Sequence, residues 1–323
     1  MRAVLCKQLG PPESLVVEEV DDPVVEPKTV VIDVKAAGVN FPDTLVIQGQ
    51  YQFKPDLPFI PGGEVAGVVR AVGDGVTDVE PGDRVIGITG TQGGFAEQTR
   101  VSRAQVVPMP DGLGFNEAAG LVFTYGTSHY ALRDRARVQP GESLLVLGAA
   151  GGVGLAAVQI GKALGARVIA AASSKEKLAV CAESGADELI DYSGEDLRER
   201  LKEVAPNGVD VVYDPVGGDY AEAALRRMAW DGRYLVIGFT AGIPQIPLNL
   251  VLLKSCQIVG VFWGAFTMRD PARNAELMAE LLGWTADGTI KPHVSKTYTL
   301  EQVPHALTDM IERKVTGKAI IVP

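Results

Sequence analysis

Cysteine and histidine are scarce in this chain, which has three of each among 323 residues. They are Cys6, Cys181 and Cys256, and His129, His293 and His305. The cysteines are odd in number and far apart, so they give neither a disulfide framework nor the spacing of a metal site. We interpret them as small buried hydrophobic residues. The histidines are equally scattered, and no Cys/His zinc set can be assembled.

The chain also lacks a surplus of basic residues, since 30 lysines and arginines stand against 40 acidic residues, for a net charge of −10. Charges of both signs are interspersed along the chain, which argues against nucleic acid as a partner. The beginning, MRAVLCKQLGPP, has no apolar segment followed by a small-residue cleavage site. We therefore expect a cytoplasmic protein.

One long uncharged run is LLVLGAAGGVGLAAVQIG, at residues 144–161. Its length matches the roughly 18–20 apolar residues that span a membrane. However, four glycines fall between residues 148 and 154, where a strand pattern ends and a helical pattern begins. The run therefore predicts a strand, a tight turn and a helix that receive a phosphate, and no membrane span.

The sequence pattern changes near residue 142. Before it, short β-type runs alternate with turn residues, which indicates a β-rich domain. After it, strand and helix patterns alternate, which is typical of a doubly wound parallel sheet. We predict an α/β protein in which a catalytic domain, residues 1–124 completed by residues 264–323, flanks a dinucleotide-binding Rossmann domain of residues 125–263.

The predicted turn reads A-x-G-x-x-G over residues 149–154, so alanine replaces the first glycine of a dinucleotide fingerprint. An NAD site would place Asp or Glu at the end of the second strand. Ser173 and Ser174 stand there instead, and Lys175 and Lys177 follow. Hydroxyl and ammonium groups suit a 2′-phosphate, so the pattern favours NADPH. The alternative is that Ser173 caps the next helix and both lysines are solvated.

Five stretches carry a family resemblance: AAGVNFPD, PGGEVAG, VEPGDRV, GAAGGVG and GKAIIVP. Together they resemble the medium-chain dehydrogenase/reductase superfamily over essentially the entire chain. Within it, the sequence is most similar to the zinc-independent NADPH quinone oxidoreductases, the zeta-crystallin-like branch. The resemblance implies a GroES-like β-rich catalytic domain, a Rossmann domain that binds NADPH, and a homodimer.

Zinc-dependent alcohol dehydrogenases of this superfamily carry Cys and His ligands in the first domain and a four-cysteine lobe. Asn40 stands where the first catalytic cysteine would fall, and Gly63 stands where the histidine would precede the retained Glu64. We interpret Glu64 as a structural partner in a glycine-rich turn. Because alcohol oxidation normally relies on zinc to acidify the hydroxyl, the changes predict no metal and favour reduction of an activated acceptor.

The resemblance also implies the residues that line the acceptor site, which are Asn40, Asp43 and Tyr51, with Tyr51 near the nicotinamide. Each has a structural alternative. Asn40 can hold a turn, Asp43 can cap a helix, and Tyr51 can simply pack.

The resemblance also implies the residues of the cofactor site. They are Thr127, Gly151, Gly152, Val153, Gly154, Ser173, Lys177, Tyr192, Ile237, Gly238, Phe239, Val261, Phe262 and Trp263. Thr127 is implied beside the nicotinamide, and Tyr192 beside the 2′-phosphate. Phe262 and Trp263 can equally be core aromatic residues.

The function predicted from these features is hydride transfer from NADPH to a quinone, with the proton supplied by solvent or a cleft hydroxyl. Quinones need little acid catalysis because conjugation delocalises the charge that the hydride brings, so positioning is most of the mechanism. One alternative is a reductase of enones, 2-alkenals or enoyl thioesters. Another is a protein that binds NADPH without catalysis.

Overall fold

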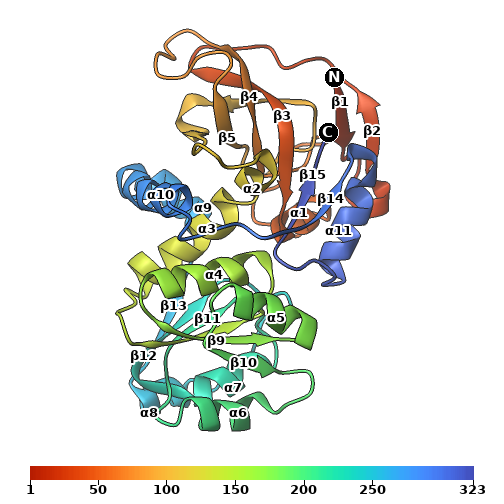
Figure 1. Ribbon diagram of the computed structural model, residues 1–323. Coiled ribbons are helices and arrows are strands. Elements are labelled where there is room, and N and C mark those ends of the chain that lie inside the picture. Colours follow the sequence, from red (N-terminus) through yellow and green to blue (C-terminus); the bar gives the residue numbers. More distant parts are fainter. The chain divides into compact units, whose positions relative to one another are not determined.

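The computed structural model describes all residues, 1–323, and they form two compact units. The first unit comprises Met1–Phe123 and Lys291–Pro323, and the second comprises Thr124–Ile290. The first unit is therefore made from both ends of the chain, and the second is inserted between them. Figure 1 follows this order by colour, because red and blue segments share the first unit.

A seven-stranded sheet in the order β14-β15-β3-β4-β5-β7, with β6 also paired to β3, forms the frame of the first unit. Its strands are β3 (Thr29–Val39), β4 (Glu64–Val72), β5 (Arg84–Ile88), β6 (Gln98–Ser102), β7 (Val106–Pro108), β14 (Val294–Tyr298) and β15 (Lys318–Ile321). A separate pair joins β1 (Arg2–Leu5) to β2 (Val16–Glu19). All pairings are antiparallel except that of β14 with β15.

The helices of the first unit are short. They are α1 (Phe41–Ile47), α2 (Phe115–Ala119) and α11 (Val303–Ile311), with 3-10 turns η1 (Pro12–Ser14), η2 (Arg103–Gln105) and η4 (Leu300–Gln302). One apolar cluster joins α1 and α11 to the sheet, because Ile47, Leu307 and Ile32 are all fully buried in it. This packing holds the start of α1 against the ends of β3 and β15, where the first candidate site lies.

Six parallel strands form the sheet of the second unit, in the order β10-β9-β8-β11-β12-β13. They are β8 (Ser143–Leu147), β9 (Arg167–Ala172), β10 (Glu188–Asp191), β11 (Val209–Asp214), β12 (Met228–Val236) and β13 (Gln257–Gly260). The crossover helices are α4 (Gly152–Ala163), α5 (Lys175–Glu183), α6 (Leu197–Val204), α7 (Tyr220–Arg226) and α8 (Asn249–Lys254). In Figure 1, α4 and α5 cover the upper face of this sheet, and α6, α7 and α8 cover the lower face.

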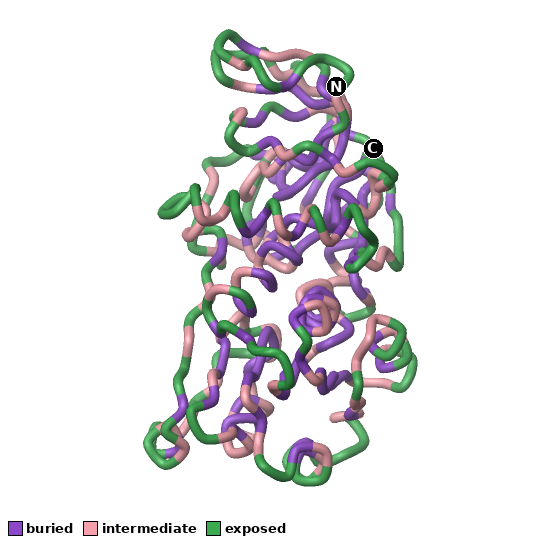
Figure 2. Tube along the Cα trace, turned by 60° about the vertical axis from the view of Figure 1, so that its left-hand side comes forward, coloured by how far each residue is buried: buried purple, intermediate pink, exposed green.

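Burial explains why these segments become strands of a parallel sheet. Every residue of β8 is buried, and β9 is buried at five of its six positions. Continuous apolar runs of this kind are typical of strands with helices on both faces. Figure 2 shows buried stretches of chain in the interior and exposed ones at the periphery. The predicted fold class, a GroES-like β-rich domain with a Rossmann-type sheet, is confirmed.

The remaining helices lie in the second unit. They are α3 (Val122–His129), whose first two residues belong to the first unit, the π-helix η3 (Tyr130–Arg135), α9 (Trp263–Arg269) and α10 (Pro271–Ala286). The boundaries predicted from the sequence joined residues 264–323 to the catalytic domain. The compact units differ, because only Lys291–Pro323 return to the first unit.

Contacts among these helices give the physical reason for that boundary. The rings of Tyr130 and Phe266 stack with their centroids 4.1 Å apart. Arg273 of α10 forms an ion pair with Asp134 at 3.0 Å. Because α9 and α10 pack on the segment that enters the second unit, they belong to it, although the sequence offers no Rossmann pattern there.

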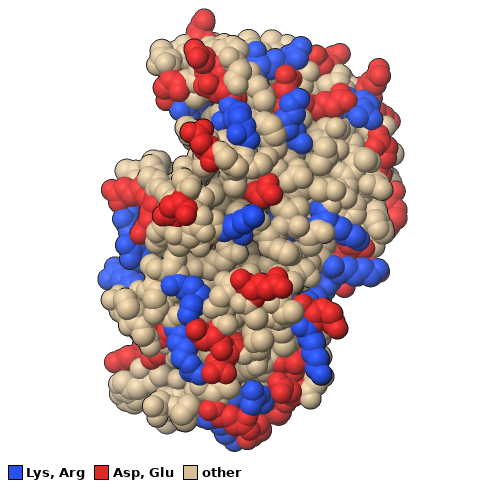
Figure 3. Space-filling model, viewed as in Figure 1, with Lys and Arg blue, Asp and Glu red and all other residues tan.

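The surface carries charges of both signs. On the face shown in Figure 3, acidic and basic side chains alternate over both units without a continuous basic area. None of the helices is long and apolar enough to pass through a membrane. The uncharged run at residues 144–161 is divided between β8, the glycine turn and α4, as predicted.

Candidate functional site

The first candidate site lies where β3 ends and α1 begins. Asn40 is the N-cap of α1, and its backbone N–H donates to Asp43 Oδ2 at 2.7 Å. The two residues form a reciprocal capping box, with a proline in the first turn between them. The sequence NFPD therefore starts a helix for local reasons, because such residues satisfy the unpaired amides of a first turn.

Lys318, the first residue of β15, places a buried ammonium beside this helix start. Its Nζ donates to Asn40 Oδ1 at 2.7 Å, to Glu64 Oε1 at 2.9 Å and to the Val39 carbonyl oxygen at 3.0 Å. Three acceptors match the three N–H bonds of an ammonium group. The Lys318 residue is 2% exposed and Glu64 is fully buried, so this ion pair is shielded from water.

Glu64 connects the remaining partners. Its Oε1 accepts from Asn40 Nδ2 at 3.0 Å, and its Oε2 accepts from the backbone N–H of Phe123 at 2.9 Å. Both ends of the Asn40 amide are therefore bonded within the protein. Glu64 is a structural partner, as expected, but Lys318, the residue it pairs with, was not identified from the sequence. The indication in the sequence is that this lysine follows a glycine and precedes an apolar strand in GKAIIVP.

Asp43 is 3% exposed, and burial raises the pKa of its carboxyl to about 7. The bond from the Asn40 backbone and the Lys318 ammonium lower this pKa, and Glu64 raises it. Tyr51 is half-buried, and both burial and the Asp43 carboxylate raise the pKa of its phenol. The first unit thus contains a carboxyl group that can exchange protons near neutral pH.

The second candidate site is the carboxyl edge of the parallel sheet. Because all six strands are parallel, the residues after their carboxyl ends share one edge. The predicted cofactor residues occupy five of these positions: Gly151–Gly154 after β8, Ser173 after β9, Tyr192 after β10, Ile237 after β12 and Val261 after β13. The chain reverses its winding between β8 and β11, where open α/β sheets commonly bind ligands.

The glycine turn after β8 has no room for side chains. Gly148 has a φ of +57°. A Cβ at Gly154 would lie 2.3 Å from the Gly148 carbonyl oxygen. Gly151 is the N-cap of α4, and the amides of a first helical turn have no partner within the helix. This arrangement fits the pyrophosphate of a dinucleotide, which such amides can receive.

The hydroxyls and ammonium groups expected for a 2′-phosphate lie at the end of β9. Lys177 Nζ donates to Ser173 Oγ at 3.2 Å. The cap of α5 is Ser174, whose Oγ accepts from the Lys177 backbone N–H, so the alternative that Ser173 caps this helix is wrong. Lys177 is partly buried and Lys175 is exposed. Only Lys177 of the two lysines is therefore held toward Ser173.

Tyr192 lies beside this group because its backbone N–H donates to the Ala172 carbonyl oxygen at 3.1 Å, one residue before Ser173. Its ring lies 4.5 Å, between centroids, from the ring of Tyr220. Of the three residues predicted for the 2′-phosphate, Ser173 and Lys177 are in side-chain contact, and Tyr192 follows the adjacent strand end. No acidic residue ends β9, where an NAD site would need one.

The other predicted cofactor residues differ in exposure. Phe239 and Phe262 are 42% and 46% exposed, and Thr127 on α3 is partly exposed. Trp263 is 5% exposed and its Nε1 donates to Asn274 Oδ1 at 3.1 Å. A Cβ at Gly126 would lie 2.8 Å from the Trp263 ring. Trp263 thus packs in the interior of its unit, which was the alternative prediction for this side chain.

Two protein-family models match these two regions. The model described as the alcohol dehydrogenase GroES-like domain matches residues 26–111. The model described as zinc-binding dehydrogenase matches residues 152–282. The first match lies within the first unit and the second within the second unit.

Known proteins are similar over nearly the full length. The quinone oxidoreductase-like protein 2 of Bos taurus is 41% identical over 99% of this chain and 92% of the relative. The quinone oxidoreductase of Mus musculus is 34% identical over 99% of this chain and 97% of the relative. The chain belongs to the medium-chain dehydrogenase/reductase superfamily, in its quinone oxidoreductase branch. It is an oxidoreductase of that type.

A solved structure supports the same assignment. The crystal structure of Escherichia coli quinone oxidoreductase complexed with NADPH superposes with a TM-score of 0.90 at 30% identity, covering 100% of both chains. The family resemblance predicted from the sequence is therefore confirmed.

The name of one matching model implies zinc, but the residues present do not fit a zinc site. No group of three or more His, Cys, Asp and Glu residues could hold a metal ion. The Lys318 ammonium already occupies Asn40 Oδ1 and Glu64 Oε1. A Cβ at Gly63 would lie 2.8 Å from the Gly90 carbonyl oxygen, so a histidine does not fit there.

Proposed function

We propose that this protein is a zinc-independent reductase that transfers hydride from NADPH to a quinone. The observation that supports this most is the carboxyl edge of the parallel sheet. There the glycine turn is followed by hydroxyl and ammonium groups, Ser173 and Lys177, in place of the carboxylate that NAD would require. Relatives at 34–41% identity are named quinone oxidoreductases or proteins like them.

The second unit supplies the groups for the cofactor. The first amides of α4, from Gly152 to Gly154, would hold the pyrophosphate. Ser173, Lys177 and Tyr192 would hold the 2′-phosphate, which rewards charge-assisted hydrogen bonds. When bound, NADPH supplies the hydride that reduces the acceptor.

The first unit supplies the groups for the acceptor, Asp43 and the phenol of Tyr51. A quinone that has received hydride becomes an oxyanion, which water can protonate. Asp43, with a pKa of about 7, and Tyr51 can each deliver a proton, but because water can replace them in that step, they act on a quinone mainly by positioning it. We propose that Asn40 acts by holding the start of α1, because its amide is fully bonded within the protein.

A second candidate function is reduction of an enone, a 2-alkenal or an enoyl thioester. This reaction depends more on the protein for proton transfer than quinone reduction does. The enolate left by hydride needs a placed proton donor for its α-carbon. Tyr51 is favoured for that role because burial and Asp43 raise the pKa of its phenol and keep it protonated. The third candidate, binding of NADPH without catalysis, predicts no turnover with either acceptor.

The test compares kcat/KM for a quinone and for an enone, in the wild type and in Tyr51→Phe. Since a required general acid contributes typically 10²–10⁴-fold, we expect Tyr51→Phe to lower quinone turnover by less than about tenfold. Enone turnover, where it occurs, should fall further. A wild type that prefers the enone by orders of magnitude, with a loss of about a hundredfold or more in the variant, would establish the second candidate.

We also propose that turnover needs no zinc. The purified protein should contain no stoichiometric zinc by elemental analysis and should keep its activity in a strong chelator. About one zinc per chain, with activity lost on its removal, would contradict this proposal.

A homodimer is proposed from the exposed edge of the second unit's sheet. β13 pairs only with β12, and Ile258 on it is 38% exposed. Next to it along the chain, Leu252 and Leu253 of α8 are 79% and 65% exposed. An apolar edge strand is a template for another chain. Sedimentation should give twice the mass of the chain, and Ile258→Lys should give the single mass.

A further inference from the structure

The buried ammonium of Lys318 has no role in the proposed function, although it is bonded directly to Asn40. Lysine is almost never fully buried unless it is paired, because removing its charge from water is costly. Here the Lys318 side chain is 3% exposed and all three of its N–H bonds have acceptors. The site is therefore built around this charge.

The neighbouring backbone leaves space for the ion pair. A Cβ at Gly120 would lie 3.0 Å from Lys318 Cγ. A Cβ at Gly38 would lie 2.6 Å from Glu64 Oε1 and 2.2 Å from the Ala119 carbonyl oxygen. The two glycines thus allow the lysine stem and the carboxylate to approach the sheet closely.

The ion pair fixes one side chain in one orientation. The Asn40 amide must turn its oxygen toward the Lys318 donor and its nitrogen toward the Glu64 acceptor. Asn40 is also the N-cap of α1, and its backbone N–H is bonded to Asp43. A displacement of the amide would therefore disturb the first turn of α1.

We propose that Lys318 is a positioning residue that, through Asn40, holds the start of α1 and thereby Asp43. This inference rests on the proposed function, in which Asp43 is one of the groups that the first unit supplies for the acceptor.

The charges around Asp43 affect the pKa of its carboxyl. The charged or titratable groups that act on the Asp43 carboxyl are Lys318 from β15 and Glu64 from β4, and Asp43 in turn acts on Tyr51 beyond α1. Lys318 lowers the pKa of Asp43 and Glu64 raises it. Removing one charge should therefore move this pKa in the direction opposite to removing the other.

The experiment uses Lys318→Met, Glu64→Gln and the double variant in the full-length protein. Lys296→Met is the matched control, because Lys296 on the neighbouring strand pairs at 2.6 Å with Asp309, which is 2% exposed, outside the candidate site. Three quantities are measured: kcat/KM for a quinone, the NADPH dissociation constant, and the pKa of Asp43. The last comes from ¹³C carboxyl shifts, assigned with Asp43→Asn.

We expect Lys318→Met to lower kcat/KM for the quinone by about tenfold or more, which corresponds to the loss of one hydrogen-bonded contact. NADPH affinity should stay within about twofold, because the phosphate-site residues belong to the second unit. The pKa of Asp43 should rise by about one unit in Lys318→Met and fall in Glu64→Gln. Lys296→Met should change none of the three quantities.

The double variant keeps the inference testable where Lys318→Met does not fold, because no unpaired charge remains. It should keep a near-normal Asp43 pKa and a lowered kcat/KM. Normal kcat/KM in the double variant, or Asp43 shifts of the same sign in both single variants, would overturn the inference. A wild type that reduces neither quinone nor enone would instead overturn the proposed function, and the inference with it.

Discussion

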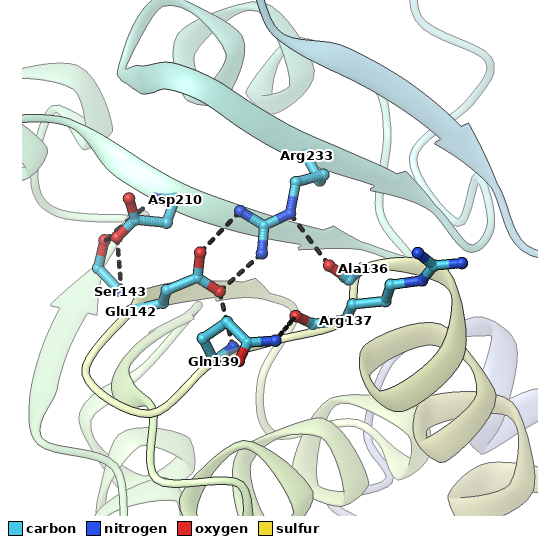
Figure 4. Close-up of polar contacts among 7 residues, drawn as sticks. All are labelled: Ala136, Arg137, Gln139, Glu142, Ser143, Asp210 and Arg233. Carbon is cyan, nitrogen blue, oxygen red and sulfur yellow. Dashed lines mark hydrogen bonds and ion pairs between the residues drawn. The ribbon is translucent and has the colours of Figure 1, made fainter.

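The two ends of the parallel sheet in the second unit are built differently. At the amino end, polar side chains satisfy one another (Figure 4). The guanidinium of Arg233 donates to both oxygens of Glu142, at 2.9 and 2.6 Å. The hydroxyl and the backbone N–H of Ser143 both donate to Asp210 Oδ2, at 2.7 and 2.8 Å. These bonds connect β8, β11 and β12 near the amino end of the sheet.

At the carboxyl end of β8, glycines replace such side chains, whereas β11 ends in the buried Asp214, whose carboxylate accepts from the Val216 and Gly217 amides and the Tyr234 hydroxyl. Gly148 and Gly154 bring the backbone close together, and the first turn of α4 directs amides outward. Ser173 and Lys177 add a hydroxyl and an ammonium group. The difference indicates that one end stabilises the sheet and the other binds a ligand. Substitutions at the two ends should therefore have separable effects.

The largest effect is expected from Gly154→Ala at the carboxyl end. Its Cβ would lie 2.3 Å from the Gly148 carbonyl oxygen, so the turn must move. Hydrogen bonds to a charged group are worth roughly 1.5–3 kcal/mol each, so we expect NADPH affinity to fall by about a hundredfold when the amides that receive the pyrophosphate move. Fluorescence titration measures it. Gly283→Ala, where nothing lies within 4 Å of the added Cβ, is the control and should bind NADPH normally.

Lys177→Ala should weaken NADPH about ten- to a hundredfold and leave NADH nearly unchanged. The reason is that a hydrogen bond to a charged group is worth roughly 1.5–3 kcal/mol, and only NADPH carries the 2′-phosphate. Lys175→Ala, at an exposed position, is the matched control. Equal losses for both cofactors would show that Lys177 does not bind the phosphate.

At the amino end, Arg233→Met should lower stability without changing NADPH affinity. Arg233 and Glu142 side chains are 16% and 22% exposed, and the variant removes the guanidinium and leaves the carboxylate only the Gln139 backbone N–H. We expect a loss of about 1–3 kcal/mol in the free energy of unfolding, measured by urea denaturation. Arg167→Met, in a pair that is 41% and 38% exposed, should lose less than about 1 kcal/mol. A weakened NADPH affinity in Arg233→Met would contradict the separation of the two ends.

The smallest effect is expected from Ser143→Ala. It removes the hydroxyl bond to the Asp210 carboxylate and the acceptor of the Asp210 backbone N–H, but it keeps the Ser143 backbone bond to the same carboxylate. The free energy of unfolding should fall by about 1 kcal/mol. NADPH titration should be unchanged, and a selective loss of binding would again contradict the comparison.

The sequence predicts a region well when the residues that form it are close together along the chain. The glycine turn and the serine and lysine after β9 form a local pattern of about thirty residues, as in βαβ fingerprints, and they lie after β8 and β9 in the structure. Lys318 could not be found in this way, because it meets Asn40 and Glu64 across 278 and 254 positions of the chain. Only the pairing of β15 with β3 brings them together.

The compact units differ from the domain boundary predicted near residue 264 for a similar reason. The helices α9 and α10 carry no Rossmann pattern, and they belong to the second unit through contacts such as Tyr130 with Phe266. The interior position of Trp263 likewise depends on its packing against Gly126, which residue type alone does not reveal. The sequence pattern was enough to locate the strands and turns. The unit boundary and the position of Trp263 depend on packing between distant segments.

The most direct test of the account is a crystal structure of the protein soaked with NADPH and a quinone. We predict the pyrophosphate at the amides of Gly152 to Gly154, the 2′-phosphate at Ser173 and Lys177, and the quinone in contact with Tyr51. A dinucleotide bound away from the carboxyl edge of the parallel sheet, or a 2′-phosphate without contact to Lys177, would contradict it.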